Sequence, residues 1–290
     1  MSAQVLSGKE CAAALRAETT EAAAKLAAAA DADGHLPRLA VVTATVDAAS
    51  AWYVRSIAAA ASRVGVACDV VDLGGDATAA AITDTLERLS ADEQVNGVML
   101  QTPLPDGARL EELAWAIAPN KDVDGANPLS LGRLAAGVAA FAPATAEAVV
   151  AILAHYRVEL AGRHAVVVGR SKVVGKPVAL LLLDRDATVT VCHSRTADLA
   201  AVTATGDLLV AAAGRTHLLT PAHVKPGAVV VDVGTNPTAD GGVAGDVDPA
   251  VAERVSGLTP VPGGVGPVTT ALLLRHTVQA ATLQADRRGG

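Results

Sequence analysis

The chain has 290 residues, enough for one large domain or two of ordinary size. Hydrophobic residues make up 51% of it but aromatic residues only 2%, so a core must be aliphatic and no aromatic series exists to stack nucleic-acid bases. The formal net charge of −7, without a basic cluster, argues against nucleic acids and anionic membranes as partners.

The amino-terminal segment has early charges and lacks the uninterrupted apolar run of a signal peptide. No apolar stretch reaches membrane-spanning length. Cys11, Cys68 and Cys192 lie far apart without metal-ligand spacing, so we expect buried cysteines, a reducing compartment and no metal site. These features predict a cytoplasmic protein.

The first part of the chain alternates between helical and strand patterns. Ser7-Gly8-Lys9-Glu10 has the form of a capping box, which predicts a long Ala-rich helix after it. The expected strands cover residues 38–45, 66–73 and 97–101, and the helices between them cover residues 48–63 and 77–89. Strands separated by helices predict a parallel sheet covered on both faces.

A second alternating series begins after Pro143. Its expected elements are strands at residues 164–169, 187–192, 207–213 and 228–234, a helix at 174–183 and a last helix at about 267–285. We therefore predict two α/β domains. The first covers residues 1–145 and is completed by the last helix, and the second covers residues 146–266.

A glycine-containing turn follows the first strand of the second domain. It reads Gly169-Arg170-Ser171-Lys172-Val173-Val174-Gly175-Lys176-Pro177. Such a turn between strand and helix lets backbone N–H groups approach a pyrophosphate at the helix N-terminus. The spacing is not G-x-G-x-x-G, so this loop alone is equally consistent with an ordinary strand–helix turn.

The end of the next strand favours one cofactor over another. Folds that bind NAD usually place an Asp or Glu there for the ribose 2′-hydroxyl, whereas this strand ends in His193-Ser194-Arg195-Thr196. With Arg170, these residues offer a cationic, hydroxyl-rich environment suited to the 2′-phosphate of NADP. The same residues are also consistent with a solvated basic loop that binds no cofactor.

Polar residues also follow the last expected strand of the first domain. Gln101 begins a Gln-Thr-Pro-Leu-Pro segment at the carboxyl end of that strand, where open α/β sheets bind ligands. The loop Lys121-Asp122-Val123-Asp124-Gly125 (the 121–125 loop) could accept two N–H bonds from a fused-ring amino-heterocycle if one Asp is buried. Standing alone, such a loop is more often a surface turn.

Two further features are unusual. Tyr53 is one of only two tyrosines and favours a packing or ligand-stacking role over that of an acid, with Ile57 on the same helical face. Before the last helix, the loop Pro262-Gly263-Gly264-Val265-Gly266-Pro267 carries two prolines and three glycines, more than a plain connector needs.

Taken together, these segments resemble the bifunctional methylenetetrahydrofolate dehydrogenase/cyclohydrolase family over nearly the whole chain and in the family's order. The matching motifs are Gln-x-Pro-Leu-Pro at Gln101, Lys-Asp-Val-Asp-Gly at Lys121, Gly-Arg-Ser-x-x-Val-Gly-x-Pro at Gly169, Asp-Val-Gly-x-Asn at Asp232, Gly-Asp-Val at Gly245, and Pro-Val-Pro-Gly-Gly-Val-Gly-Pro at Pro260.

The resemblance implies a homodimer with a folate cleft between two α/β domains, the second a Rossmann-type NADP domain. Tyr53 should stack on the aminobenzoate, Asp124 should bond the pterin edge and Gln101 should lie beside the reacting carbon. The implied substrate contacts are Tyr53, Gln101, Asp124, Pro262, Gly263 and Gly264. The implied cofactor contacts are Gly169, Arg170, Ser171, Val174, Gly175, Pro177, His193, Ser194, Arg195 and Thr235, with the Gly263–Gly264 loop close by.

Three departures from the family pattern fall on the folate side. The helix usually reads Tyr-x-x-x-Lys, but here the lysine position is Ile57. The usual Gly-x-x-Pro-Ala-Ser loop is Thr45-Val46-Asp47-Ala48-Ala49-Ser50, and the Pro-Cys-Thr-Pro segment is Pro143-Ala144-Thr145-Ala146.

The missing lysine affects the two family reactions differently. The dehydrogenase step moves a hydride from the folate methylene bridge to the nicotinamide and needs no proton transfer. The cyclohydrolase step needs a general acid/base, which Ile57 cannot be and for which Arg55, about 200° away round the helix, is a poor substitute. We predict a dehydrogenase that has lost or impaired cyclohydrolase activity. A full bifunctional enzyme and a non-catalytic paralogue that binds a folate-like ligand remain alternatives.

Overall fold

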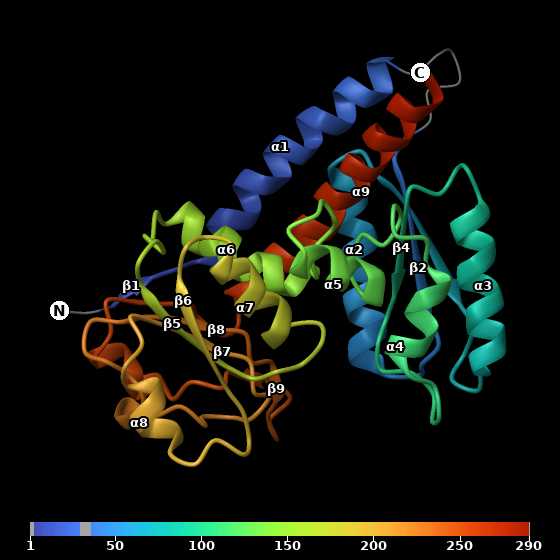
Figure 1. Cartoon of the computed structure of the whole chain (residues 1–290). Coiled ribbons are helices and arrows are strands. Elements are labelled where there is room, and N and C mark those ends of the chain that lie inside the picture. The colour runs from blue at the N-terminus through green and yellow to red at the C-terminus, as the bar shows by residue number, and fades with distance from the viewer. Residues whose placement is uncertain (1–2, 30–35, 290) are drawn as a thin grey trace. The chain divides into compact units, whose positions relative to one another are not determined.

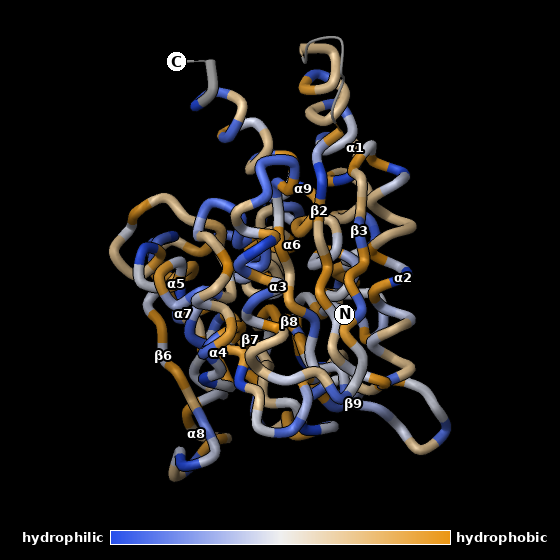
Figure 2. The backbone as a smooth tube through the Cα atoms, turned by 90° about the vertical axis from the view of Figure 1, so that its right-hand side faces the viewer, coloured by the Kyte–Doolittle hydropathy of each residue, from blue (hydrophilic) through white to orange (hydrophobic). Residues whose placement is uncertain are grey.

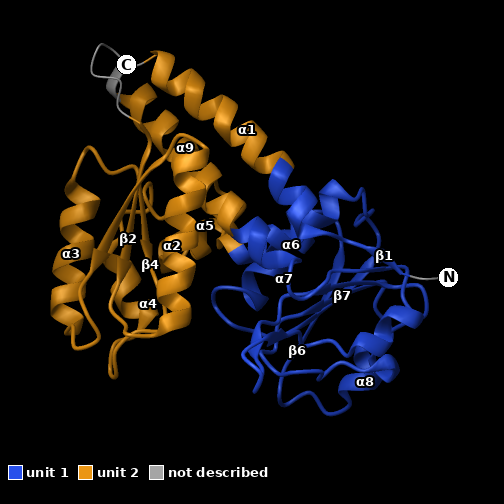
Figure 3. Cartoon of the chain, turned by 180° about the vertical axis from the view of Figure 1, so that it is seen from behind, with its two compact units in different colours: residues 1–13, 145–269 blue, residues 14–144, 270–290 orange. Residues whose placement is uncertain are grey.

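The structure is a computed structural model that describes residues 3–29 and 36–289 (Figure 1). The chain divides into two compact units (Figure 3). Unit 1 comprises Met1–Ala13 and Thr145–Thr269, and unit 2 comprises Ala14–Ala144 and Thr270–Gly290. Two long helices, α1 (Gly8–Ala29) and α9 (Val265–Gly289), each belong partly to both units.

Unit 2 contains a three-stranded parallel sheet in the order β3-β2-β4. Its strands are β2 (Arg38–Thr43), β3 (Ala67–Asp72) and β4 (Gly97–Leu100). Helices α2 (Ala48–Arg63) and α3 (Ala79–Ala91) connect them and lie on opposite faces of the sheet (Figure 1).

The alternation of side chains along β2 explains these two layers. Leu39 and Val41 pack in the apolar cluster that contains α2 and α9 residues, whereas Ala40 and Val42 pack in the cluster that contains α3. Successive side chains of a strand point to opposite faces, so a fully apolar strand requires a helix on each side. The predicted doubly covered parallel sheet is confirmed.

Short helices complete unit 2: α4 (Leu110–Leu113), a 3₁₀ turn at Ala114–Ala116 and α5 (Pro128–Ala135). Side-chain caps define several helix starts, because an N-terminal turn leaves backbone N–H groups without helical partners. Asp47 caps α2, Thr78 caps α3 and Asn127 caps α5.

Unit 1 contains a six-stranded parallel sheet in the order β1-β11-β8-β7-β5-β6. The strands are β1 (Gln4–Val5), β5 (His164–Val168), β6 (Thr188–Cys192), β7 (Leu208–Ala211), β8 (Val229–Asp232) and β11 (Gly257–Leu258). Its other elements are α6 (Ala144–His155), α7 (Gly175–Leu183), α8 (Leu199–Thr203), 3₁₀ turns at Pro221–His223 and Pro249–Glu253, and a small hairpin of β9 (Asn236–Pro237) and β10 (Val243–Ala244).

The central strands of this sheet are buried on both faces. Val166, Val167 and Val168 of β5 are at most 2% exposed, although they alternate between the faces. Figure 2 shows the strands as hydrophobic segments of the backbone tube. This all-parallel, doubly covered architecture confirms the predicted second α/β domain.

The structure differs from the expectation at the amino terminus. The first domain was expected to start at residue 1, but β1 pairs with β11, and Gly8 N donates to Gly263 O at 3.0 Å. Residues 3–13 therefore lie in unit 1. A two-residue strand has no periodicity, so the sequence could not reveal this pairing. The pattern also did not predict α6, α8 or β11.

Two remaining expectations concern cysteines and membrane segments. Cys11 and Cys192 are buried as expected, whereas Cys68 is only partly buried. Burial still raises the pKa of the Cys68 thiol to about 11, so it stays protonated at neutral pH. Among the described residues, no helix is long and apolar enough to cross a membrane.

Candidate functional site

The turn between β5 and α7 is built so closely that two of its positions admit only glycine. Gly169 has φ +132°, and a Cβ there would lie 2.1 Å from the carbonyl oxygen of Ala212. A Cβ on Gly175 would lie 2.2 Å from the carbonyl oxygen of Gly169. The start of α7 thus packs directly on the end of β5, the arrangement in which strand–helix turns approach a pyrophosphate.

Ser171 shapes the same turn from within. Its Oγ accepts from the backbone N–H groups of Val174 and Gly175, each at 3.2 Å. The neighbouring Arg170 side chain is exposed, and Pro177 is buried in the first turn of α7, where a missing N–H costs no helical bond. The turn therefore combines a fixed backbone with an exposed cation.

A second turn, at the end of β6, lies at the same edge of the sheet because β5 and β6 pair with Val168 opposite Cys192. Within it, His193 N donates to Thr196 Oγ1 at 2.9 Å, and Arg195 N donates to His193 Nδ1 at 3.2 Å. His193 Nδ1 is thus an acceptor, which puts its proton on Nε2. The side chains of Ser194 and Arg195 are exposed.

The first carboxylate after this turn belongs to Asp198. Its Oδ1 accepts from Ala201 N at 3.0 Å and caps α8. No carboxylate occupies residues 193–197, where a ribose-binding Asp or Glu would be expected for NAD.

Two buried aspartates hold the loops after β7 and β8. Asp246 accepts from the backbone N–H groups of residues 213–215 at 2.6–2.9 Å and from Asn236 Nδ2 at 2.9 Å. Asp232 accepts from Gly234 N, Asp246 N and Val247 N at 2.9–3.0 Å. Burial raises the pKa of Asp232, against these hydrogen bonds.

Sequence reasoning recognised the segments that contain these aspartates but gave them no role. The glycines of the same motifs were a usable sign of their role, because each Asp packs against a glycine position that has no space for a side chain. A Cβ on Gly245 would lie 1.9 Å from Asp232 Oδ2, and a Cβ on Gly234 would lie 2.5 Å from Asp246 N. Thr235, an expected cofactor contact, is exposed in the loop that this network fixes.

The glycine-rich loop before α9 also has a defined packing partner within unit 1. Gly263 has φ +104°, and a Cβ on Gly264 would lie 2.6 Å from Pro260 O. A Cβ on Gly8 would lie 1.6 Å from Gly264 O, so the start of α1 contacts this loop through backbone alone. Pro262 is exposed beside it and follows a cis peptide bond.

In unit 2, the 121–125 loop runs beside β4. Val98 N donates to Lys121 O at 2.8 Å, and Val98 pairs with Asp122 in a parallel bridge. Gln101 and Asp124 therefore follow the carboxyl ends of adjacent parallel segments. Gln101 is 8% exposed, and its backbone N–H donates to Val42 O at 2.8 Å.

The two aspartates of the 121–125 loop have different surroundings. The fully buried Asp122 accepts from Ala126 N and Asn127 N, both at 2.9 Å, and from Ser130 Oγ at 2.6 Å. In the described part of the chain, no group donates a hydrogen bond to the Asp124 carboxylate. Burial and the charge of Asp122 raise the pKa of Asp124 to about 7.

Tyr53 lies near this carboxylate. It is partly buried on α2, its hydroxyl makes a hydrogen bond with Thr270, and burial together with the charge of Asp124 raises its pKa. The structure thus brings Tyr53 close to Asp124, with Gln101 at the end of the strand next to the 121–125 loop. A partly buried carboxylate without donors in the described protein is suited to accept N–H groups from a ligand.

Ile57, one helical turn after Tyr53, is 0% exposed. It belongs to an apolar cluster with Val54, Val123 and Leu273. The helix face that carries Tyr53 therefore continues into the hydrophobic core and offers no ionisable group at this position.

The two altered segments have defined surroundings in the structure. In the changed loop before α2, Asp47 accepts from Ser50 N at 2.7 Å and caps the helix, which lowers the pKa of Asp47. Ser50 Oγ in turn donates to Thr102 O at 3.2 Å. Ala144 and Ala146 are both buried at the start of α6.

Comparison with known families agrees with both sets of features. Residues 6–124 match the catalytic domain, and residues 143–285 match the NAD(P)-binding domain, of tetrahydrofolate dehydrogenase/cyclohydrolase. The chain belongs to the tetrahydrofolate dehydrogenase/cyclohydrolase family. The family expected from the sequence motifs is confirmed, and the NAD(P)-binding match covers the β5–α7 and β6 turns.

Relatives of this family are similar over almost the full length. The chain is 64% identical to the bifunctional protein FolD 1 of Saccharopolyspora erythraea, over 96% of this chain and 94% of that protein. A solved FolD structure from Campylobacter jejuni superposes with a TM-score of 0.92 at 38% identity, covering 97% and 99% of the two chains. The methylenetetrahydrofolate dehydrogenase-cyclohydrolase of Trypanosoma brucei, solved with NADP and an inhibitor, gives 0.93 at 36% identity, covering 98% and 99%.

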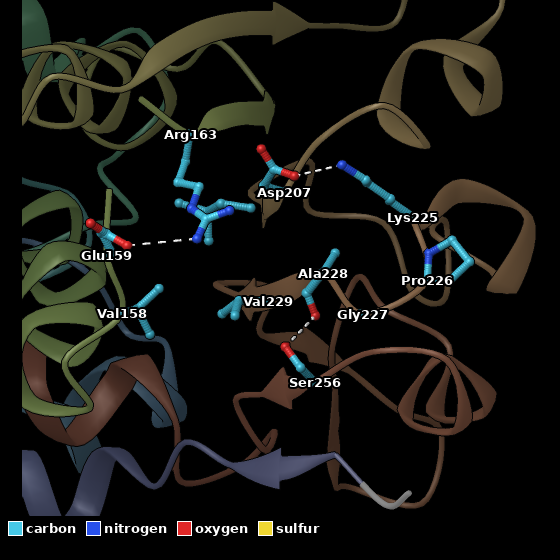
Figure 4. Close-up of a pocket in the computed structure, with 11 residues that line it drawn as sticks. Val158, Glu159, Arg163, Asp207, Lys225, Pro226, Gly227, Ala228, Val229 and Ser256 are labelled. Atoms are coloured by element: carbon cyan, nitrogen blue, oxygen red, sulfur yellow. Dashed lines mark hydrogen bonds and ion pairs between the residues drawn. The ribbon is translucent and has the colours of Figure 1, made fainter. Parts of the chain in front are cut away.

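A pocket of about 230 Å³ lies at the amino ends of the unit 1 strands (Figure 4). Its charged groups are paired: Lys225 Nζ lies 2.6 Å from Asp207 Oδ1, and Arg163 lies 3.6 Å from Glu159. The pocket contains none of the expected site residues. Parallel sheets of this class bind ligands at their carboxyl ends, so the family motifs, not this pocket, mark the candidate site.

Proposed function

We propose that this protein is an NADP-linked methylenetetrahydrofolate dehydrogenase whose cyclohydrolase activity is lost or strongly impaired. The observation that carries this proposal is the position of Ile57, fully buried in an apolar cluster one turn after Tyr53. The cyclohydrolase reaction needs a proton donor and acceptor, and the family lysine that would serve is absent at this position. The dehydrogenase reaction needs only positioning, and the residues expected to position its substrates are present.

The dehydrogenase reaction relies on positioning. We assign the pterin edge to Asp124, whose carboxylate has no protein donors in the described structure, and the aminobenzoate to Tyr53. We place the Gln101 amide beside the reacting carbon. The bound nicotinamide supplies the hydride acceptor, and substrate nitrogen lone pairs stabilise the cationic product. No side chain must gain or lose a proton, so orientation supplies most of the rate enhancement.

The cofactor residues support NADP. Gly169 and Gly175 let the start of α7 pack directly on the end of β5, because a Cβ on either would collide with a backbone carbonyl oxygen. A strand–helix turn of this kind points a helix N-terminus at a pyrophosphate. Arg170 and Arg195 are both exposed at the ends of neighbouring strands, and no carboxylate lies in residues 193–197. Guanidinium groups bind phosphate oxygens with paired N–H donors, which favours a 2′-phosphate over a 2′-hydroxyl.

The second candidate is the complete bifunctional enzyme. Two observations favour it: the relative at 64% identity is named bifunctional, and the Asp124 carboxyl has a pKa of about 7, within the useful range for a general acid/base. In this candidate, Asp124 or a bound water would carry out the proton transfers that the lysine carries out in other family members.

A paired assay separates these candidates. The unaltered protein is given methylenetetrahydrofolate with NADP, and NADPH formation is followed; separately, it is given methenyltetrahydrofolate, and the decay of that absorbance is followed. We expect NADPH formation without enzyme-dependent decay. A decay well above the spontaneous rate would establish the bifunctional enzyme. If neither activity is present while a folate analogue still binds, the protein is a non-catalytic folate-binding paralogue.

The substitution Ile57→Lys probes the same position, with Ile57→Met as its unbranched apolar control. A lysine here must find a route out of an apolar cluster, so we expect a loss of more than about 2 kcal/mol in stability. Thermal unfolding measures this. Gain of hydrolysis in the lysine variant but not the methionine variant would show that the proton-transfer group is what the native chain lacks.

We also propose that the protein is a homodimer that takes a tetrahydrofolate derivative as its partner ligand. Sedimentation equilibrium of the purified protein tests the dimer, since a monomer would give the 28.9 kDa mass of one chain.

A further inference from the structure

His276 lies on α9, next to the 121–125 loop. It is 2% exposed, and its Nδ1 lies 2.8 Å from the carbonyl oxygen of Val123. A carbonyl oxygen can only accept, so Nδ1 carries a hydrogen and donates it. Because Val123 lies between Asp122 and Asp124, this bond fixes the backbone between the two aspartates.

The imidazole ring is itself held in place. Its centroid lies 5.0 Å from that of Phe141, with the ring planes 34° apart. The next residue, Thr277, helps to close the space behind the loop: a Cβ on Gly97 would lie 2.8 Å from Val123 Cγ1 and 3.1 Å from Thr277 Oγ1. Val123 is thus packed between β4 and α9.

His276 also acts on Asp124 through its charge. Burial and the charge of Asp122 raise the pKa of Asp124, and the positive charge of His276 lowers it. Tyr53, on α2, also faces this carboxyl. The charge of His276 also lowers the pKa of Asp122, whose carboxylate accepts three hydrogen bonds, whereas the Asp124 carboxylate accepts none from the described protein.

Ionisation matters for the proposed ligand. An ionised carboxylate offers two acceptor oxygens to the two N–H groups on one edge of a pterin, whereas a protonated carboxyl turns one of them into a donor. A charge on the ring therefore favours the form of Asp124 that binds.

We propose that His276 is a positioning residue for the folate site, which holds the 121–125 loop through Val123 and favours the anionic form of Asp124. This inference rests on the proposed assignment of Asp124 to the pterin edge. It gives α9 a role in substrate recognition through a residue that contacts the loop from behind.

Two variants separate the roles of the hydrogen bond and the charge. His276→Asn keeps a donor near the Nδ1 position but cannot be charged, and His276→Leu removes both. His155→Asn, an exposed position on α6 in unit 1, is the matched control. For each, the KM for methylenetetrahydrofolate, the KM for NADP and kcat are measured across pH.

For His276→Asn, we expect the folate KM to rise about ten-fold at about pH 6.5 and to recover near pH 8.5, since loss of the cation raises the pKa of Asp124 and lowers its anionic fraction at the lower pH. His276→Leu should raise the folate KM at every pH, because the loop loses its anchor. The KM for NADP should stay unchanged in both. A His276→Asn profile that matches the His155→Asn control would overturn the inference.

A measurement without substrate keeps the inference apart from the proposed function. Carbon NMR of protein labelled at Asp carboxyl groups, with Asp124 assigned through Asp124→Asn, gives the Asp124 pKa directly. We expect this pKa to be higher in His276→Asn than in the unaltered protein, and an unchanged value would refute the electrostatic role. If the pKa shifts but the unaltered protein forms no NADPH, the proposed function fails while the action of His276 on Asp124 stands.

Discussion

The two aspartates of the 121–125 loop show how one short motif can combine structure with binding. Asp122 is fully buried and receives three hydrogen bonds, so its carboxylate organises the turn that leads into α5. Asp124, two residues later, receives none from the described protein, and its pKa is raised to about 7. A carboxylate left in this state destabilises the folded protein until a ligand supplies N–H donors.

This difference makes a stability prediction. The Asp124 pKa is raised from 3.8 to about 7, so its protonated form stabilises the fold below about pH 4, and this stability is lost as pH rises through about 7. Asp124→Asn removes the titration. We expect the variant to melt at a higher temperature than the unaltered protein at about pH 8, with the difference shrinking toward pH 4. It should also lose most folate binding, and a destabilised variant at pH 8 would contradict the environment assigned to Asp124.

At the cofactor turns, the prediction concerns selectivity. Arg170→Ala and Arg195→Ala each remove an exposed guanidinium from neighbouring strand ends. Loss of a charge-assisted bond to phosphate costs about 1.5–3 kcal/mol, or roughly 10- to 100-fold in affinity, so NADP binding should weaken by that factor while NAD binding changes little. Titration calorimetry with both cofactors measures this. Equal affinity of the unaltered protein for NADP and NAD would rule out the assignment.

At the scale of elements, the sequence predicted what local patterns encode. The buried Val-rich strands β2, β5 and β8 and the amphipathic helix α2 were found within a few residues of their observed bounds. The patterns did not predict β1 and β11, because two-residue strands form only through pairing with distant partners. Nor could they assign Asp232 and Asp246, whose backbone donors are up to 33 residues away.

In the candidate site too, local patterns could be predicted from the sequence and contacts between distant residues could not. The motifs pointed to Gly169, Gly175 and Asp124, because each marks a backbone or charge requirement that only one residue type meets. His276 lacked any such signal, since a lone histidine in a long helix is ordinary. Its role depends on the approach of α9 to Val123, a contact between residues 153 positions apart.

The β5–α7 turn provides a test at this scale. In Gly175→Ala, the added Cβ would lie 2.2 Å from Gly169 O if the backbone stayed in place, so the turn must open. We expect a loss of about 1–3 kcal/mol in stability together with loss of NADP binding. Gly132→Ala, in α5, is the matched control: no atom lies within 4 Å of its Cβ, and alanine is the better helix former. Equal behaviour of the two variants would show that the turn tolerates a side chain.

On the scale of the whole molecule, the motifs divide between the two units. Unit 1 holds the 169–177 and 193–196 turns and the 260–267 loop, and unit 2 holds Tyr53, Gln101 and the 121–125 loop. Only α1, α9 and the start of α6 continue from one unit into the other. We therefore expect unit 1 to supply most of the cofactor contacts and unit 2 to supply Tyr53, Gln101 and Asp124 to the folate.

This division predicts which amides each ligand protects from hydrogen exchange. Ligand binding slows exchange where it fixes the backbone, because local opening must first release the ligand. NADP should protect residues 170–175 and 194–196 in unit 1, and a folate analogue should protect residues 101–104 and 122–125 in unit 2. Mass spectrometry of the full-length protein with each ligand alone, and with both, measures the pattern.

The pocket at Arg163 and Lys225 is an internal control, since it should remain unprotected by either ligand. Protection by NADP confined to that pocket would move the cofactor to the amino edge of the sheet and overturn the assignment of the β5–α7 turn. Protection of unit 2 by NADP alone, without a folate analogue, would instead show that one ligand orders both units.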